Sequence, residues 1–204
     1  TAVSMARVAA KIDASTMSLY RYVPSKKDLL ELMVDAALDR PPSLPAGATW
    51  RSGLLLWANE LAARYRAHPW ALQVPISGPP LGPNNVRWLE SGLAALGGAR
   101  LTDPQKFSAV LTVSAYVRGV ESIAAGIRSN VALSGRQPDD YGEMLAHLID
   151  PAHFPQLHRA IGVGALRDED PSDIGIDDEL SFGLERILDG VGALIRSNGS
   201  RRST

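Results

Sequence analysis

Apolar side chains recur every three or four residues along most of the chain, which is the spacing of one face of an α-helix. This spacing predicts helices over residues 4–12, 26–38, 50–67, 103–128, 139–149, 155–163 and 177–199. The clearest series lies within 103–128 and consists of Val110, Val113, Val117, Val120, Ala124 and Ile127. No segment alternates apolar and polar residues convincingly, as a half-buried strand does. The pattern therefore predicts an all-α protein.

Clusters of proline and glycine separate the helical segments, because both residues interrupt regular helices. The longest cluster, RPPSLPAGA, occupies residues 40–48. Shorter clusters lie at 68–69, 77–83 and 97–98. We expect the stretch 40–48 to be a linker between a small N-terminal unit, 1–39, and a helical body, 49–204.

The composition is that of a globular protein. Of the 204 residues, 45% are hydrophobic and 21% are charged, and the formal net charge is −1. These values exclude a disordered tail, and the lack of cysteine excludes a disulfide scaffold or a thiolate metal site. No run approaches the roughly 18 apolar residues of a membrane span, and the first residues lack the apolar segment of a signal peptide. We therefore expect a cytoplasmic protein that binds no membrane.

Charge is unevenly distributed despite the balanced total. Residues 1–27 carry five basic side chains and a single acid, Asp13. Residues 167–179 carry seven acids and one arginine, a pattern typical of a solvated loop. The N-terminal unit is therefore the basic part of the chain, as expected of a surface that meets nucleic acid.

Residues 4–25 have the pattern of a helix-turn-helix. The first helix ends before a break at Asp13, and Ser15 is a suitable N-cap for a short second helix. Leu19 and Val23 lie four residues apart and are expected to pack inward, which leaves the other side chains of that helix on the surface. A short second helix of this kind can enter a DNA major groove. An ordinary pair of solvated helices would show the same features, so pattern and charge alone leave both interpretations open.

The order of residues is more specific than the pattern. The run VAAKIDASTMSLYRYVPSKKDLLELMVDAAL, residues 8–38, resembles the DNA-binding motif of the TetR (tetracycline-repressor-like) family. The matching positions are Val8-Ala9, Ile12, Ser15, Leu19-Tyr20, Tyr22-Val23, Ser25-Lys26 and Leu29-Leu30. The resemblance continues more weakly through the body. It implies a DNA-binding domain over 1–39, the linker 40–48, and an effector-binding and dimerisation domain over 49–204.

The resemblance also implies which residues contact double-stranded operator DNA. The side chains implied to face base edges are Thr16, Met17, Ser18 and Arg21. The side chains implied to hold phosphates are Tyr20, Tyr22 and Lys26. At the preceding helix, the implied contacts are Ser4, Met5 and Arg7.

Three departures from the family pattern stand out. Asp13 occupies the turn position where the family has glycine, so a left-handed backbone there would carry a cost. Tyr22 replaces the common histidine. Most of the first helix of the family's three-helix DNA-binding domain is absent from residues 1–39.

Two long segments, 103–128 and 177–199, carry an apolar stripe beside a stripe of small residues, which allows another helix to approach closely. The family resemblance implies that they pair with their copies in a homodimer, and intramolecular packing is the alternative. The candidate interface residues are Ala115, Gly119, Ser122, Gly126, Leu184, Ile187, Val191 and Leu194.

Large apolar side chains in the body suggest an effector cavity, although any single one is as readily explained by core packing. The candidate effector-binding residues are Trp57, Leu61, Trp88, Val113, Tyr116 and Val117. Arg118 and Glu121 are further polar anchors or, alternatively, a surface pair. The metal-binding histidine of the tetracycline repressor has no counterpart near Tyr116. We therefore expect a small apolar or aromatic effector rather than a tetracycline–Mg²⁺ complex.

No catalytic or phosphate-binding motif occurs in the chain. Three histidines lie in HLIDPAHFPQLH, but Pro151 and Pro155 interrupt the segment, so no single helix face can present them as metal ligands. We expect no enzyme activity, no cofactor and no metal. The sequence predicts a ligand-responsive transcriptional regulator of the repressor type. The competing interpretation is a helical small-molecule-binding protein without a regulatory role.

Overall fold

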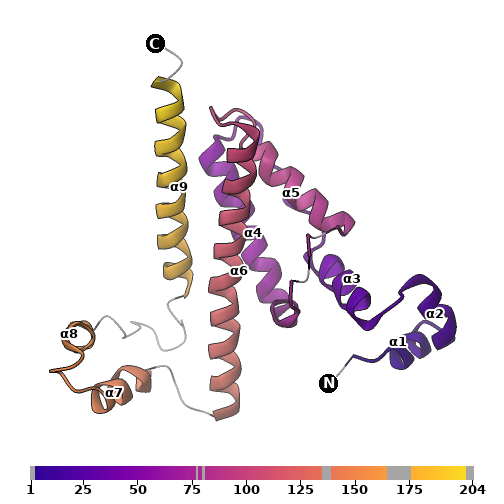
Figure 1. Cartoon of the computed structure of the whole chain (residues 1–204), viewed down its shortest axis with the longest axis horizontal. Helices are drawn as coiled ribbons and strands as arrows, with labels where there is room; N and C mark the ends of the chain where they lie inside the picture. The colour runs from indigo at the N-terminus through magenta and orange to yellow at the C-terminus, as the bar shows by residue number, and fades with distance from the viewer. Residues whose placement is uncertain (1–2, 77, 80, 135–138, 165–175, 201–204) are drawn as a thin grey trace. The chain divides into compact units, whose positions relative to one another are not determined.

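The regular elements in a computed structural model of the chain are all helical, as the sequence predicts (Figure 1). The structure describes residues 3–76, 78–79, 81–134, 139–164 and 176–200. Its α-helices are α1 (Met5–Lys11), α2 (Thr16–Tyr22), α3 (Lys26–Leu38), α4 (Trp50–Ala67), α5 (Pro83–Ala95), α6 (Asp103–Ser134), α7 (Asp139–Leu148), α8 (Pro155–Gly162) and α9 (Ile176–Ser200). A 3₁₀ helix, η1, spans Pro69–Gln73.

The chain divides into two compact units, residues 1–99 and 100–204. The first unit contains more than the helix-turn-helix, because α3 packs against α4, α5 and η1. This division is set by which residues pack together, and it does not test the predicted functional domains. The predicted domain boundaries at residues 39 and 49 stay a prediction. Most of the acidic segment lies outside the described residues, and its last four residues, 176–179, belong to α9.

Serine side chains begin the three N-terminal helices. The hydroxyl of Ser4 caps α1, that of Ser15 caps α2 and that of Ser25 caps α3, each accepting from a backbone N–H three residues later. The cap predicted at Ser15 is therefore confirmed. Ser25 also donates its hydroxyl to the Asp28 carboxylate at 2.7 Å, so Asp28 binds the capping side chain itself.

The helix-turn-helix is held by a small apolar core. Its buried members come from α1, α2 and α3 and from the residue after α2: Met5, Ala9, Leu19, Val23 and Leu29. The inward positions predicted for Leu19 and Val23 are confirmed. Because Leu29 lies in this core and Met33 packs against it, α3 is part of the DNA-binding unit as well as a neighbour of α4 and α5.

The turn between α1 and α2 depends on Asp13, whose φ of 52° lies in the left-handed region. An L-residue with a Cβ is strained there, and aspartate tolerates the conformation better than most residues. We expect Asp13→Ala to lower the free energy of unfolding by about 1 kcal/mol, whereas Asp13→Gly leaves it unchanged or raises it slightly. Urea denaturation of the two variants measures the difference. Equal stabilities would show that the turn is not strained.

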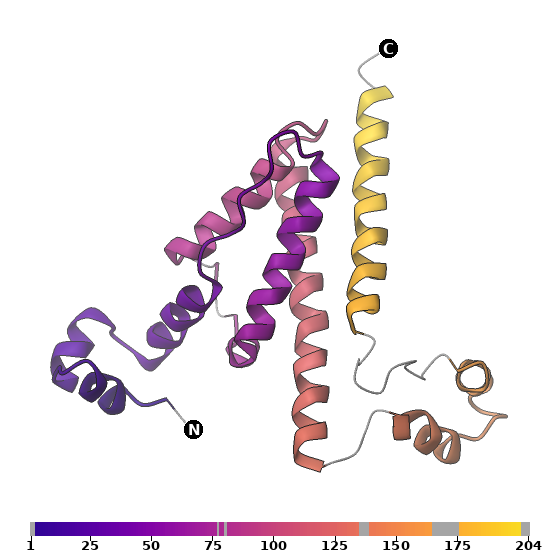
Figure 2. The same cartoon turned by 180° about the vertical axis from the view of Figure 1, so that it is seen from behind.

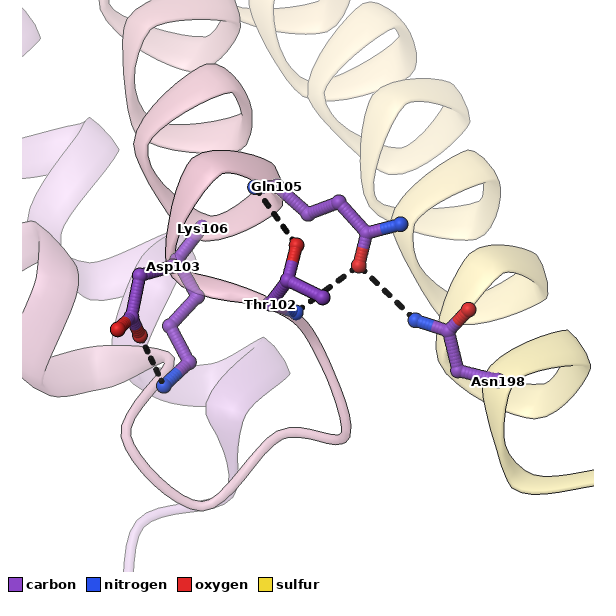
Figure 3. A network of polar contacts seen from close by, with 5 residues as sticks. All are labelled: Thr102, Asp103, Gln105, Lys106 and Asn198. Atoms are coloured by element: carbon purple, nitrogen blue, oxygen red, sulfur yellow. Dashed lines mark hydrogen bonds and ion pairs between the residues drawn. The ribbon is translucent and has the colours of Figure 1, made fainter. Parts of the chain in front are cut away.

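The second unit is built on α6 and α9, which lie side by side and antiparallel (Figure 1, Figure 2). At one end, Thr102 and Gln105 form a reciprocal cap at the start of α6. Asn198 of α9 donates to the Gln105 side chain at 2.9 Å (Figure 3). It also donates to the Arg100 carbonyl at 3.0 Å. These bonds fix the register of the helix pair, because they join residues more than ninety positions apart.

By length and composition alone, residues 103–133 of α6 could cross a membrane. The core helix of a water-soluble protein passes the same test, and α6 packs along α9 and buries the charged residue Glu121. α6 also extends to Ser134, six residues beyond the segment predicted from apolar spacing.

Candidate nucleic-acid interface and effector core

The outer face of α2 is a row of exposed side chains. Met17 is 80% exposed, and Ser18, Tyr20, Arg21 and Tyr22 are also exposed. This exposure follows from the burial of Leu19 and Val23, since one face of a two-turn helix cannot point both inward and outward. The surface predicted to read DNA is thus free of packing within the described chain.

Arg21 lies beside the aromatic ring of Tyr22. Its guanidinium carbon is 5.3 Å from the centre of the Tyr22 ring, and its Nη2 donates to the Tyr22 hydroxyl at 3.4 Å. Cation–π contact of this kind limits the positions of a long side chain. Arg21 is therefore presented at the end of α2 as a partly ordered positive charge, suited to a base edge or a phosphate.

Lys26 is exposed at the first position of α3, where unpaired backbone N–H groups and the helix dipole favour an anion. Arg7 is exposed on α1, and its Nε donates to the Ser4 hydroxyl at 3.4 Å. These positions agree with a role in holding the DNA backbone.

Met5 occupies a different environment from the other predicted DNA contacts. Its side chain is 6% exposed and belongs to the helix-turn-helix core. The Met5 side chain is therefore unavailable to DNA, and only its backbone at the start of α1 remains as a contact. The sequence gives no sign of this, because methionine suits a core and a surface equally well.

The effector candidates of the first unit are core side chains. Trp57 on α4, Leu61 on α4 and Trp88 on α5 are all nearly fully buried. The Trp57 indole N–H donates to the Trp88 carbonyl at 2.9 Å, and the two rings meet edge to face at 5.6 Å. Both indoles thus join helices of this unit, and their predicted contact with an effector stays a prediction.

The effector candidates of the second unit lie on α6. Val113 and Val117 are fully buried. Tyr116 donates its hydroxyl to the Glu179 carbonyl of α9 at 2.6 Å, and burial together with the Glu179 carboxylate raises the pKa of the phenol above its usual value. Gly183 makes room for this tyrosine, because a Cβ at Gly183 would overlap the Tyr116 hydroxyl.

Glu121 is fully buried on α6, and its carboxylate lies 3.6 Å from the Arg128 guanidinium. The alternative of a surface pair between Glu121 and Arg118 is therefore wrong for Glu121. Burying a carboxylate is costly unless a positive charge lies close to it, and Arg128, two turns further along, lies within ion-pair distance.

The predicted dimer residues fall into two groups. On α6, Ala115, Gly119, Ser122 and Gly126 are all exposed, and a Cβ added at either glycine would meet no described atom within 4 Å. On α9, Leu194 is exposed and Ile187 and Val191 are half-buried, whereas Leu184 is fully buried within the chain. The small-residue stripe of α6 is thus open, and Leu184 serves packing within the chain.

Sequence reasoning missed the site that joins α3 to α5. Asp35 is buried although it is charged, and its carboxylate accepts hydrogen bonds from residues 84 and 85, about fifty positions away. In the sequence Asp35 is simply an acidic residue within a predicted helix, where a solvated side chain would be expected. A distant partner of this kind cannot be identified from local spacing.

Among the described residues, no group of three or more His, Asp or Glu side chains is placed to hold a metal ion. His153 and Asp150 form an exposed pair at 2.6 Å. The pKa of Asp150 is lowered by a hydrogen bond from the Ala152 N–H and by the one to His153. His147 instead lies 2.7 Å from the Glu143 carbonyl within α7, so these histidines have local roles.

Comparison with known proteins identifies relatives over most of the chain. Residues 41–195 match the family described as "Tetracyclin repressor-like, C-terminal domain". The HTH-type transcriptional repressor DrrR1 of Streptomyces coeruleorubidus is 37% identical over 201 residues, covering 94% of this chain and 70% of the relative. An HTH-type transcriptional regulator of Saccharopolyspora erythraea is 32% identical over 173 residues, covering 74% of this chain and 73% of the relative.

Solved structures show the same fold. The TetR family protein ActR of Streptomyces coelicolor in complex with actinorhodin superposes with a TM-score of 0.75 at 24% identity, covering 95% of this chain and 88% of ActR. ActR without ligand superposes with a TM-score of 0.74 at 23% identity, covering 94% and 87%. The all-α arrangement with an N-terminal helix-turn-helix and a helical C-terminal domain is therefore that of a known class of regulator.

Proposed function

This chain belongs to the tetracycline-repressor-like (TetR) family of transcriptional regulators, and from that premise we propose that it is a repressor released from operator DNA by a small molecule. Members of the family are DNA-binding regulators and not enzymes. The relative of Streptomyces coeruleorubidus carries the name of a repressor, which supports repression rather than activation. The site of action would be the cytoplasm, where operator DNA is found.

The observation that carries the proposal is the free outer face of α2. Met17 and Arg21 are exposed on it, Arg21 contacts the Tyr22 ring, and Lys26 is the first residue of α3, where an anion is favoured. Methionine suits contact with the thymine methyl group, arginine suits a base edge, and lysine suits a phosphate. With Thr16, Ser18 and Tyr20 on the same helix, they form one DNA-reading surface.

A homodimer is the form in which this surface would read DNA, because two reading helices one DNA turn apart match a palindromic operator. The open stripe of Gly119 and Gly126 supports α6 as the contact helix. Two large apolar side chains beside it, Leu111 at 60% exposed and Ile123 at 65%, support the same conclusion. Apolar surface of this size on a regulator is suited to burial against a second copy.

The effector would bind within the helical body that follows residue 48. ActR, a structural neighbour, has been solved with actinorhodin and with (S)-DNPA, which supports a small molecule as the ligand. For this chain we propose the apolar or aromatic class that the sequence predicts. Such a ligand would act through its different affinity for the DNA-binding and released forms of the protein. The match of the family model from residue 41 onward supports a functional boundary near the Pro-rich stretch.

The proposal is tested by sequencing genomic DNA bound to the full-length protein and measuring the affinity for the recovered site at several salt concentrations. A palindromic site whose binding weakens steeply with salt is the expected result. A helical ligand-binding protein without a regulatory role would recover no common sequence, and that outcome would overturn the proposal.

Two variants separate sequence reading from backbone contact. Lys26→Ala is expected to weaken binding to all DNA sequences. The slope of the logarithm of the binding constant against the logarithm of the salt concentration should become shallower by about one unit. Arg21→Ala is expected to cost about 1–3 kcal/mol on the operator and to relax the preference at one base pair. Lys27, paired with Glu31 at 3.8 Å, supplies the control variant Lys27→Ala. Wild-type binding by both test variants would show that α2 is not the reading helix.

A further inference from the structure

The four methionines of the chain differ sharply in exposure. Three of them, Met5, Met17 and Met33, fall within the first 39 residues. Met5 is buried in the helix-turn-helix core and Met33 packs against that core, whereas Met144 on α7 is 46% exposed. Met17 on α2 is 80% exposed. The most exposed methionine of the chain therefore lies on the surface proposed to read DNA.

Met17 shares the outer face of α2 with Tyr20 and Arg21, which follow it by three and four residues. Side chains at these spacings are neighbours on the surface of a helix. All three are exposed, and the Arg21 guanidinium lies beside the Tyr22 ring. The Met17 thioether is therefore one helical turn from the cation that is proposed to reach a base edge.

The sulfur of an exposed thioether reacts with hydrogen peroxide in a single two-electron step. A sulfur lone pair attacks one peroxide oxygen, so that an S–O bond forms and the O–O bond breaks. The departing hydroxide takes up the proton of the transferred oxygen and leaves as water, while the sulfur becomes a sulfoxide. The chain contains no cysteine, whose thiolate would react first. Because the attack needs access to the sulfur, Met17 should be oxidised well before Met5.

A sulfoxide at position 17 is unsuited to the DNA-reading surface for two reasons. It replaces an apolar side chain by a polar one, which loses the contact that methionine can make with a thymine methyl group. It also adds a hydrogen-bond acceptor one helical turn before Arg21, whose guanidinium is a donor only. An Arg21 side chain bound to that oxygen is withheld from a base edge. Since Met17 lies outside the helix-turn-helix core, these losses leave the fold intact.

We propose that Met17 is an oxidation site of the DNA-reading surface, at which hydrogen peroxide forms methionine sulfoxide and lowers operator affinity. This inference rests on the proposed function and adds to it a second input besides the effector. Operator bound to α2 covers the sulfur, so the oxidation acts on the free protein and hinders its return to DNA. Methionine sulfoxide reductases reverse the change, one enzyme for each epimer, so the oxidised state is reversible.

Peptide mass mapping of the full-length protein, treated with hydrogen peroxide, measures the oxidation of each methionine. In the free protein we expect Met17 to be oxidised first, Met144 next and Met5 last, in the order of their exposure. Operator DNA should slow the oxidation of Met17 and leave that of Met144 unchanged. Met144, on α7, is therefore an internal reference in the same sample.

Operator affinity is measured before and after the treatment, and each protein is compared with itself. In the wild type we expect a loss of about tenfold, which lies within the cost of one mismatched base pair, and a recovery after incubation with the two reductases. Met17→Leu removes the sulfur and keeps a long apolar side chain, so the treatment should not change the affinity that this variant has. Met144→Leu is the matched control and should lose affinity as the wild type does. Circular dichroism follows the fold throughout.

A treated Met17→Leu protein that loses affinity as the wild type does would place the sensitive group elsewhere and overturn the inference. A wild-type protein with Met17 converted to sulfoxide and an undiminished affinity would also overturn it. Oxidation of Met5 ahead of Met17, together with loss of the helical signal, would show that peroxide damages the core instead. If the untreated protein selects no operator, the proposed function fails and this inference fails with it.

Discussion

Trp57→Ala is expected to lower the free energy of unfolding by about 3–5 kcal/mol, the largest effect of any single truncation considered for this chain. Trp57 is 2% exposed, meets the Trp88 ring edge to face and donates its indole N–H to the Trp88 carbonyl. The substitution leaves a cavity, removes an aromatic pair and leaves a buried carbonyl without its partner. Urea denaturation followed by circular dichroism measures the loss.

Two further variants show which part of Trp57 matters. Trp57→Phe keeps most of the ring and loses the hydrogen bond, so its cost should be about 1–2 kcal/mol. Trp70 is 37% exposed on η1, and Trp70→Ala should cost clearly less than Trp57→Ala. A Trp57→Ala protein of wild-type stability that binds operator but no longer responds to its effector would contradict a core role. It would support the predicted role of Trp57 in the effector pocket.

The helix-turn-helix could be predicted in detail because its determinants are local. The Ser15 cap acts within three residues, and the pair Leu19 and Val23 is set by one helical turn. The left-handed turn at Asp13 is implied by the family resemblance, because the family has glycine at this position. Where structure depends on neighbours in sequence, apolar spacing and capping rules are sufficient.

The parts that could not be predicted depend on residues far apart in the chain. Gly183 and Gly190 lie seven positions apart on α9 and look alike in the sequence. A Cβ at Gly183 would overlap Tyr116, whereas one at Gly190 would meet no described atom within 4 Å. Asp35 and Glu121 are likewise charged residues whose burial becomes visible only when the helices are assembled. Local patterns identify the helices, and the specific partners of their polar residues come from tertiary packing.

The small-residue stripe of α6 leads to the second large effect. Gly119 and Gly126 are exposed, and a Cβ at either would meet no described atom within 4 Å. Leucine at these positions should therefore leave the fold of the single chain intact. If the stripe is a close helix contact between two copies, the same side chain overpacks that contact by about 1–3 kcal/mol or more at each copy.

We expect Gly119→Leu and Gly126→Leu to sediment as folded monomers and to lose operator affinity by about 100-fold or more, because two linked reading helices bind far more tightly than one. Sedimentation velocity, circular dichroism and operator binding measure the three properties. Gly162→Leu on α8, where a Cβ also meets no described atom within 4 Å, is the control and should remain dimeric. A stable dimer in both α6 variants would remove the stripe from the interface, and outright unfolding would show that the glycines serve packing within the chain.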